Sequence, residues 1–175
     1  YIQFLLDTCA KHDLGYIIPL TDLEIDVINR QREKVESKGI ILCMQSSDVL
    51  DVARDKYKLS STFDDDENVP SVRTTLLTNM PEDFPFPCIA KPYNGRSSEG
   101  LLRNATREQV NAIENKDIYI LQEQLSGNVF TVDYVRNAHT AHDAAVPRQE
   151  LLRTKNGAGL TVQMIADPAL IKLVS

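Results

Sequence analysis

The sequence has few cysteines, and their arrangement suits neither disulfides nor a zinc site. Cys9, Cys43 and Cys88 are odd in number, and each lies in an apolar stretch. No C-x-x-C pair occurs, and the three histidines show no zinc-ligand spacing with these cysteines. Because disulfide frameworks and zinc sites need paired ligands, this pattern predicts three reduced, buried thiols in a cytoplasmic protein.

Two further absences narrow the class of protein. No stretch approaches the roughly 18 consecutive apolar residues of a membrane-spanning helix, so we expect no membrane contact. Basic residues are also fewer than acidic ones: the chain has 19 Lys and Arg and 25 Asp and Glu, which gives a net charge of −6. An extended nucleic-acid interface needs a clustered basic face, so we expect no nucleic-acid partner; a local anion site remains compatible with the acidic whole.

The chain of 175 residues is long enough for one core or two small lobes. In its first part, short apolar runs indicate buried strands at Tyr16–Leu20 and Ile40–Met44. Helical patterns are indicated at Ile2–His12, at Leu23–Lys38 and at Asp48–Asp55. Strands and helices that alternate at these lengths predict an α/β unit with a parallel sheet.

The second part indicates an α+β arrangement that follows a polar connector, Asp64–Glu67, near a boundary at residues 57–66. Strands are expected at 71–77, 88–91, 119–124, 129–135 and 144–152. Helices are expected at 106–115, with Thr106 as the N-cap, and from 167 onward. Because Ser126-Gly127-Asn128 is a turn sequence, we expect strand 129–135 to be the antiparallel partner of strand 119–124. The predicted fold class is therefore α/β followed by α+β.

The segment Pro87–Gly100 (PCIAKPYNGRSSEG) carries the clearest functional signal. An apolar strand delivers Lys91 beside a small flexible loop, Asn94–Gly100. The lysine supplies a point charge for polyphosphate, and the backbone N–H groups and hydroxyls of the loop supply donors. This is not a Walker loop, in which the lysine follows the glycines and a helix begins there.

In their order along the chain, these elements resemble the ATP-grasp superfamily, most closely its carbamoyl-phosphate-synthetase-like carboxylate–amine ligases. The matching pieces extend over nearly the whole chain: Tyr16–Glu24, Asp55-Lys56-Tyr57, Pro87–Gly100, Ile120–Leu125, Thr131-Val132-Asp133, Ala145–Arg148 and Gly157–Gly159. The resemblance implies two domains. Residues 1–55 would form part of the parallel-sheet domain that precedes the grasp fold, and residues 56–175 the first part of an ATP-grasp domain.

The resemblance also implies a nucleotide site. Lys91 would bind the ATP phosphates, and Lys56 would reach the α-phosphate. The loop over the β- and γ-phosphates would contribute Gly95, Ser97, Ser98, Glu99 and Gly100. Adenine would lie against Gln122, Glu123, Gln124 and Leu125. Plainer alternatives are a surface lysine, a flexible hairpin turn and an ordinary amphipathic strand.

Two arginines and one acidic loop each have both a functional and a structural interpretation. By resemblance, Arg148, and secondarily Arg153, would face the acyl or phosphate side of the cleft, where a guanidinium can bind two oxygens at once. Each could equally be a surface charge on an edge strand. The loop with Asp22 and Glu24 resembles part of an acceptor site, but a helix cap after Thr21 is the simpler interpretation.

The sequence departs from the family pattern in two places. Where family members carry an acidic residue that binds the ribose hydroxyls, this chain has Val129, so Asn128 would have to substitute or ribose binding would differ. The carboxylates and asparagine that hold Mg²⁺ late in the fold are also not found, so we expect the magnesium ligands outside this chain and none within it. Both ends of the sequence look like cuts through a larger protein.

The resemblance implies an ATP-dependent ligase that acts through an acyl-phosphate intermediate. Its cofactors would be ATP and Mg²⁺, and its partners a small carboxylate and an amine, with oligomerisation left open. We expect this chain by itself to bind nucleotide without completing the reaction. The alternative is a non-catalytic nucleotide-binding or regulatory module.

Overall fold

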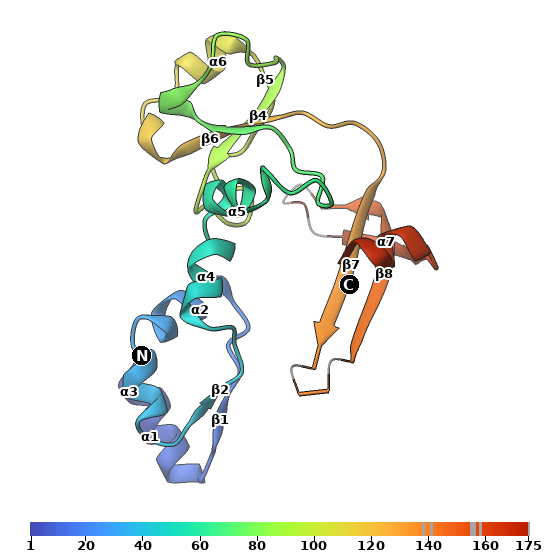
Figure 1. Ribbon diagram of the computed structural model, residues 1–175. Coiled ribbons are helices and arrows are strands. Elements are labelled where there is room, and N and C mark those ends of the chain that lie inside the picture. Colours follow the sequence, from blue (N-terminus) through green and yellow to red (C-terminus); the bar gives the residue numbers. More distant parts are fainter. Residues whose placement is uncertain (138, 141, 155–156, 158, 175) are drawn as a thin grey trace. The chain divides into compact units, whose positions relative to one another are not determined.

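The computed structural model describes residues 1–137, 139–140, 142–154, 157 and 159–174. The chain divides into two compact units, Tyr1–Arg54 and Asp55–Ser175 (Figure 1). Each unit has its own buried core, and the two are described separately below. Within the described residues, no helix is both long enough and apolar enough to cross a membrane.

The first unit is built from short helices around a two-stranded sheet. Its elements are α1 (Ile2–His12), β1 (Tyr16–Ile17), α2 (Asp22–Asn29), α3 (Arg32–Glu36), β2 (Ile41–Leu42) and α4 (Ser47–Ala53). The strands are parallel, with Tyr16 opposite Ile41 and Ile17 opposite Leu42. The predicted α/β character of this part is confirmed, although both strands are shorter than the apolar runs suggested.

The expected helix 23–38 is instead two helices, α2 and α3. The side chain of Asn29 lies at the break, where its Oδ1 accepts hydrogen bonds from Arg32 Nε and Ser47 Oγ. Asparagine side chains compete with the helical backbone for such bonds, which favours a helix end at this position. The second helix, α3, ends at Glu36, two residues before the expected end, and Gly39 follows with a φ of 75°.

The loop after β1 forms a helix cap, as the simpler interpretation predicted. Thr21 accepts a hydrogen bond from the backbone N–H of Glu24, and the Glu24 carboxylate accepts from the N–H groups of Thr21 and Leu20. Asp22 is not free either, because it forms an ion pair with Arg54 at 3.1 Å, and Asp26 binds the same guanidinium. Both carboxylates of the loop thus stabilise the first unit locally.

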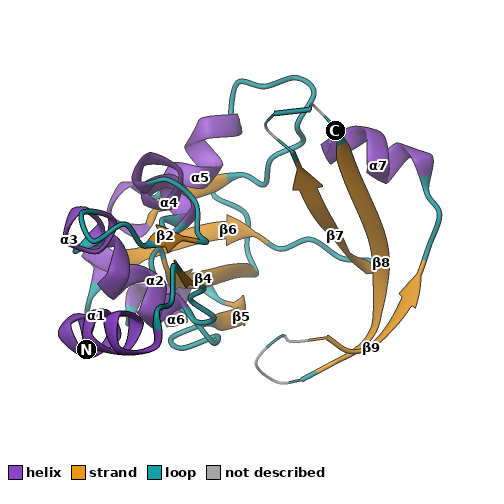
Figure 2. Cartoon of the chain, turned by 90° about the horizontal axis from the view of Figure 1, so that it is seen from below, coloured by secondary structure: helices purple, strands orange, loops and turns teal. Residues whose placement is uncertain are grey.

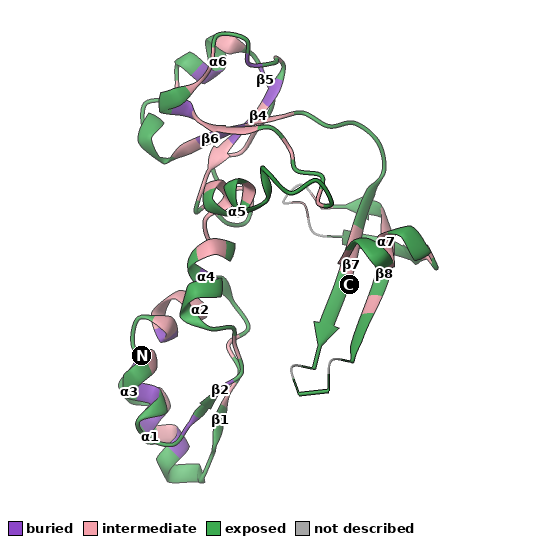
Figure 3. Ribbon diagram, viewed as in Figure 1, coloured by how far each residue is buried: buried purple, intermediate pink, exposed green. Residues whose placement is uncertain are grey.

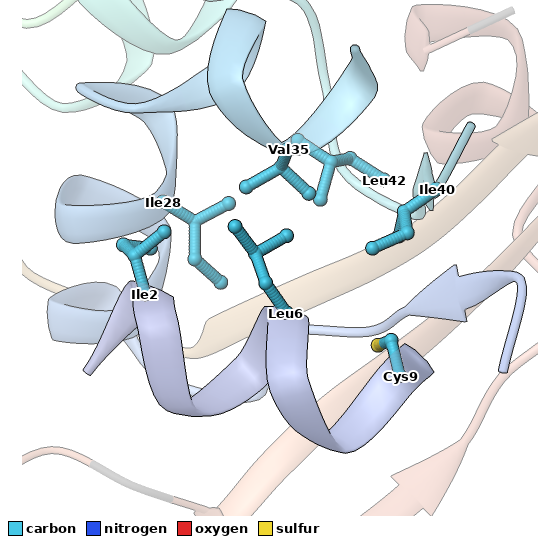
Figure 4. Packing of buried hydrophobic residues seen from close by; sticks show 7 residues of the cluster. All are labelled: Ile2, Leu6, Cys9, Ile28, Val35, Ile40 and Leu42. Atoms are coloured by element: carbon cyan, nitrogen blue, oxygen red, sulfur yellow. The ribbon is translucent and has the colours of Figure 1, made fainter. Parts of the chain in front are cut away.

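The core of the first unit consists of side chains from α1, α2, α3 and β2, together with Ile40 just before β2 (Figure 4). Ile28 and Val35 are completely buried, and the other members are Ile2, Leu6, Cys9, Ile40 and Leu42. The prediction of three buried thiols is wrong for one of them. Cys9 and Cys88 are buried, but Cys43 is exposed, because Leu42 takes the inward-facing position beside it.

The second unit begins with α5 (Lys56–Phe63) and a four-stranded antiparallel sheet in the order β3-β6-β4-β5. The strands are β3 (Thr74–Leu76), β4 (Cys88–Pro92), β5 (Leu102–Ala105) and β6 (Tyr119–Glu123), joined by η1 (Leu77–Asn79), α6 (Arg107–Asn111) and η2 (Lys116–Ile118). Thr106 caps α6 with a capping box, as the sequence predicted. Cys88, Ala90, Val110 and Leu121 are completely buried in the core of this sheet. Figure 3 colours buried residues of the chain purple.

A separate three-stranded antiparallel sheet follows, in the order β7-β8-β9, with α7 (Pro168–Val174) against it (Figure 2). Its strands are β7 (Val129–Arg136), β8 (Asp143–Arg153) and β9 (Gly159–Met164). The expected pairing of strand 129–135 with strand 119–124 is therefore wrong: β7 pairs with β8, from Val129 opposite Glu150 to Arg136 opposite Asp143. The physical reason is that β6 already has β3 on one side and β4 on the other, so it offers no free edge.

Among the α-helices and strands, three were not anticipated from the sequence: α5, β5 and β9. The strand β5 is the most consequential, because it forms the edge beside β4 and carries Arg103. Its four residues include the polar Arg103 and Asn104, and Asn104 has a φ of 50°. Such a strand has no clean alternation of apolar and polar residues, so the pattern gave no signal.

We predict that Ile28→Ala lowers the free energy of unfolding of the first unit by about 2–5 kcal/mol, the usual cost of emptying a buried aliphatic site. Ile28 is completely buried, whereas Ile18 is 66% exposed, so Ile18→Ala is the matched control and should change stability by less than about 0.5 kcal/mol. Urea unfolding followed by far-UV circular dichroism, with hydrogen exchange in α1, measures both. Equal effects of the two variants would contradict the described core.

Candidate functional site

A hollow of about 330 Å³ lies in the second unit, and we call it the cationic hollow. It brings together seven of the residues that the sequence assigned to nucleotide binding: Lys56, Lys91, Gly95, Ser97, Ser98, Glu99 and Gln122. Arg153 also lines it. The other assigned residues, Gly100, Glu123, Gln124, Leu125 and Arg148, are not part of its lining.

Strand alternation in β4 places Lys91 in this hollow. Cys88 and Ala90 point into the core and are completely buried, so Ile89 and Lys91 must point to the opposite face of the strand. Both of these side chains line the hollow. On the neighbouring strand β6, Lys91 lies opposite Ile120. The lysine is therefore fixed by the sheet register and does not depend on a loop for its position.

Positive charge is concentrated in the hollow. Five cationic side chains line it, with Glu99 as the one carboxylate among its described lining residues: Lys56, Lys91, Arg96, Arg103 and Arg153. The pKa of Lys91 is lowered, first by burial and then by the nearby charges of Lys56 and Arg103. Such a cluster in a protein of net charge −6 is suited to binding a polyanion.

The loop after β4 has an unusual backbone conformation. Ser97, Ser98 and Gly100 have φ values of 50°, 59° and 67°. Gly100 is doubly constrained, because a Cβ there would lie 2.6 Å from Tyr119 Oη, which donates a hydrogen bond to the Gly100 carbonyl at 3.0 Å. Residues in the left-handed region are uncommon outside glycine, and successive ones turn backbone N–H groups toward a shared concavity.

Gly95 is constrained by a close approach, because a Cβ there would lie 3.2 Å from Pro92 Cβ. The same residue is bound by Lys56, whose Nζ donates to the Gly95 carbonyl at 2.6 Å and to the Tyr93 carbonyl at 3.4 Å. Lys56 lies at the start of α5, where Asp55 caps the helix by accepting from the N–H groups of Tyr57 and Lys58. The first turn of α5 is thereby joined to the loop.

The end of β6, assigned to adenine, is tied to its neighbours by hydrogen bonds. Gln122 Nε2 donates to Thr74 Oγ1 at 2.8 Å. Glu123 Oε1 accepts from the backbone N–H of Arg73 at 3.4 Å, and Gln124 Oε1 accepts from that of Asn104 at 2.9 Å. Leu125 is 66% exposed beyond the strand.

The two candidate arginines of β8 lie in different surroundings. Arg148, in mid-strand, forms an ion pair with Asp133 at 2.9 Å and does not line the hollow. Arg153, at the end of β8, lines it, donates from Nε to the Gly157 carbonyl at 3.1 Å and forms an ion pair with Glu150. A hydrogen bond from Thr131, then the charges of Arg153 and Arg148, hold the pKa of Glu150 below its usual value.

Sequence reasoning assigned no role to five residues of the hollow: Ile89, Pro92, Arg96, Leu101 and Arg103. Ile89 could have been found from its alternation with the small buried residues Cys88 and Ala90. Leu101 and Arg103 gave no such signal, because β5 itself was not anticipated. Among the described residues, no group of three or more His, Cys, Asp or Glu lies where it could hold a metal ion.

A family model described as ATP-grasp domain matches residues 53–167 of the chain. No curated protein sequence matches it. Among solved structures, the biotin carboxylase domain of 2-oxoglutarate carboxylase from Hydrogenobacter thermophilus is similar, with a TM-score of 0.76 and 13% identity over 98% of this chain. That structure was obtained with MgADP, ADP and bicarbonate.

A ligase and a synthetase are also similar in structure. D-alanine–D-alanine ligase from Bacillus anthracis has a TM-score of 0.58 and 14% identity over 95% of this chain. N5-carboxyaminoimidazole ribonucleotide synthetase from Thermus thermophilus has a TM-score of 0.54 and 18% identity over 77% of it. The present chain spans 43%, 59% and 38% of the lengths of the Hydrogenobacter, Bacillus and Thermus chains.

We predict that Lys91→Met raises the thermal unfolding midpoint of the ligand-free protein, because it removes a charge disfavoured by burial and by two neighbouring cations. The difference from wild type should shrink as the pH rises toward 10.5, the usual lysine value. Because Lys91 has a lowered pKa in the folded state, it releases its proton there before the unfolded chain does, and wild-type stability rises with pH in this window.

The matched control for this prediction is Lys116→Met, since Lys116 is exposed and lies outside the hollow. Differential scanning fluorimetry across the alkaline range compares the three proteins. A Lys91→Met variant that is less stable than wild type at neutral pH would mean that the lysine contributes favourably to the ligand-free fold.

Proposed function

Because the chain belongs to the ATP-grasp domain family, we propose that its second unit binds ATP in the cationic hollow and serves an ATP-dependent ligase. The observation that carries this proposal is the convergence of five cationic side chains with a loop of left-handed residues in one hollow of an acidic protein. A triphosphate is the common ligand that needs both the charges and the backbone donors.

We assign the phosphates to Lys56, Lys91 and the loop. Lys91 is fixed by β4 and supplies a charge without rearrangement, which is the condition for effective electrostatic stabilisation. The ammonium of Lys56 already binds the loop carbonyl of Gly95, so it stands next to the position of the phosphates. Ser97 and Ser98 line the hollow and add hydroxyl donors, with Glu99 and Gly100 completing the loop.

We assign the adenine ring to the apolar side of the hollow. Ile89 and Leu101 line it and would contact one face of the ring. The polar edge of the ring would meet the end of β6 and the residues after it, Gln122–Leu125. Position 129, where an acidic side chain would bind the ribose hydroxyls, is a valine in this chain. We therefore assign the ribose to the neighbouring Asn128.

The proposed reaction joins a small carboxylate to an amine. A carboxylate oxygen forms a bond to the γ-phosphorus, the bond to the β-phosphate oxygen breaks, and ADP leaves. The amine nitrogen then attacks the carbonyl carbon of the acyl phosphate, and inorganic phosphate leaves as the nitrogen loses a proton. The residues of this chain hold and neutralise the phosphates. We assign to Arg148 the steadying of the acyl phosphate, for which it would have to leave its ion pair with Asp133 and reach the hollow that it does not line.

Magnesium is expected with the nucleotide, as in the MgADP of the Hydrogenobacter structure. The described residues do not fit a magnesium site, because Glu99 is the one carboxylate among the described lining residues and no metal-binding group of three acidic or histidine side chains occurs there. Mg²⁺ prefers oxygen ligands and binds phosphates directly. In the described part of the chain the nucleotide phosphates would thus be its ligands.

A second candidate is a nucleotide-binding or regulatory module without chemistry. Val129 favours it, because the expected ribose-binding acid is absent from the sequence at this position. Turnover separates the two candidates: an enzyme releases phosphate from MgATP when a carboxylate and an amine are both present, whereas a module binds ATP and releases none.

We predict that the chain binds ATP with Mg²⁺ and that Lys91→Ala weakens this binding about 10- to 100-fold, the usual effect of losing a charged hydrogen bond. Lys116→Ala should leave the affinity unchanged, since Lys116 lies outside the hollow. Isothermal titration calorimetry with ATP and GTP measures the affinity and the selectivity for adenine. If the wild-type chain binds no adenine nucleotide, the assignment of the hollow fails.

A further inference from the structure

Three cations of the hollow have no role in the assignments above: Arg96, Arg103 and Arg153. Arg103 lies on β5, at the edge of the four-stranded sheet, and its side chain is exposed. Within the described part of the chain, Arg103 has no hydrogen bond or ion pair, whereas Arg54, Arg73 and Arg148 are each paired with a carboxylate. A guanidinium with five donors and no acceptor beside other cations is poised for an incoming anion.

Arg103 and Arg153 come from different sheets and converge on one point. An ideal Cβ on Gly157 would lie 3.6 Å from Nη2 of Arg153 and 3.9 Å from Nη2 of Arg103. The Oγ of Ser98, in the loop after β4, is also 3.9 Å from that position. Among the described residues, two guanidinium groups and a hydroxyl thus approach the position that a Cβ of residue 157 would take, and residue 157 is glycine.

The positive charge at this point is only partly compensated. Glu150 forms an ion pair with Nε of Arg153, and the Gly157 carbonyl accepts from the same Nε. Both contacts are made by Nε, and Nη2 is the atom that approaches the shared point. Arg103 brings a second full charge that no described carboxylate pairs with. Like charges that converge in this way favour an anion between them.

We propose that Arg103, Arg153 and the hydroxyl of Ser98 form an oxyanion subsite at the edge of the cationic hollow. The inference rests on the proposed function, since the hollow is taken to hold the nucleotide. The subsite would bind one planar or tetrahedral oxyanion through two guanidinium groups, an arrangement that matches paired oxygens. The oxyanion is either a phosphate of the nucleotide or the carboxylate of the second substrate, and the test below separates the two.

The test uses Arg103→Gln, which removes the charge, and Arg103→Lys, which keeps the charge but removes the planar guanidinium that can bind two oxygens at once. Arg136→Gln is the matched control, because Arg136 is an exposed arginine of the second unit outside the hollow. Because Arg103 is exposed, neither variant should impair folding, which thermal unfolding checks. The probes are inorganic tripolyphosphate, the series ATP, ADP and AMP, and succinate added to the ADP-bound protein.

A phosphate subsite predicts that Arg103→Gln weakens tripolyphosphate and ATP binding about tenfold or more and AMP binding little, with Arg103→Lys in between. A carboxylate subsite predicts unchanged nucleotide affinities and loss of succinate binding. The proposal is overturned if Arg103→Gln binds tripolyphosphate, ATP, ADP and succinate as the wild type does.

The outcome distinguishes this inference from the proposed function. If the wild type and Arg103→Gln bind ATP with equal affinity, and also bind succinate with equal affinity, the nucleotide site is supported and the oxyanion subsite is contradicted. A different outcome separates the two in the other direction. If Arg103→Gln weakens tripolyphosphate binding but the wild type binds ATP no more tightly than tripolyphosphate, the subsite is supported and the adenine assignment is contradicted.

Discussion

The position of Lys91 in the cationic hollow is the constraint on which the second unit depends. The alternation of β4 buries Cys88 and Ala90 completely and turns Lys91 to the other face, among four further cations. Burial and like charge lower the pKa of Lys91, so the ligand-free fold holds this charge at a cost. An anion removes that cost, which means that the same arrangement that disfavours the empty fold favours the bound one.

The backbone of the loop after β4, Asn94–Gly100, is also ordered before any ligand binds. Three of its residues have positive φ, and the Gly100 carbonyl accepts the Tyr119 hydroxyl while Lys56 binds the Gly95 carbonyl. Each of these bonds orders backbone that a free loop would leave mobile, which lowers the entropy lost when a ligand binds. Backbone held in sparsely populated conformations is common where a site is organised in advance.

The sequence predicted the local features of this protein well and the non-local ones poorly. Thr21 and Thr106 cap their helices as expected, and β4 delivers Lys91 as expected, because each depends only on neighbouring residues. The pairing of β7 was wrong because it depends on whether β6 has a free edge, which no local pattern encodes. Arg103 was not predicted as a site residue because its strand, β5, was not predicted. Likewise, the placement of Arg153 at the hollow and of Arg148 away from it follows from their positions along β8 and not from residue type: Arg148 is opposite Thr131 of β7, whereas Arg153 is opposite Gly159 of β9.

The register of β7 and β8 also bears on the missing acidic residue at position 129. Val129 lies opposite Glu150, so their side chains share one face of the sheet, and a carboxylate does lie beside the position that the family pattern would make acidic. Its oxygens are engaged, however, because Thr131 Oγ1 donates to one at 2.6 Å and Arg153 pairs with the other. Freeing Glu150 for a ribose would leave Arg153 uncompensated at the edge of the hollow. Glu150 is therefore better explained as the residue that positions Arg153 than as a substitute for the acid.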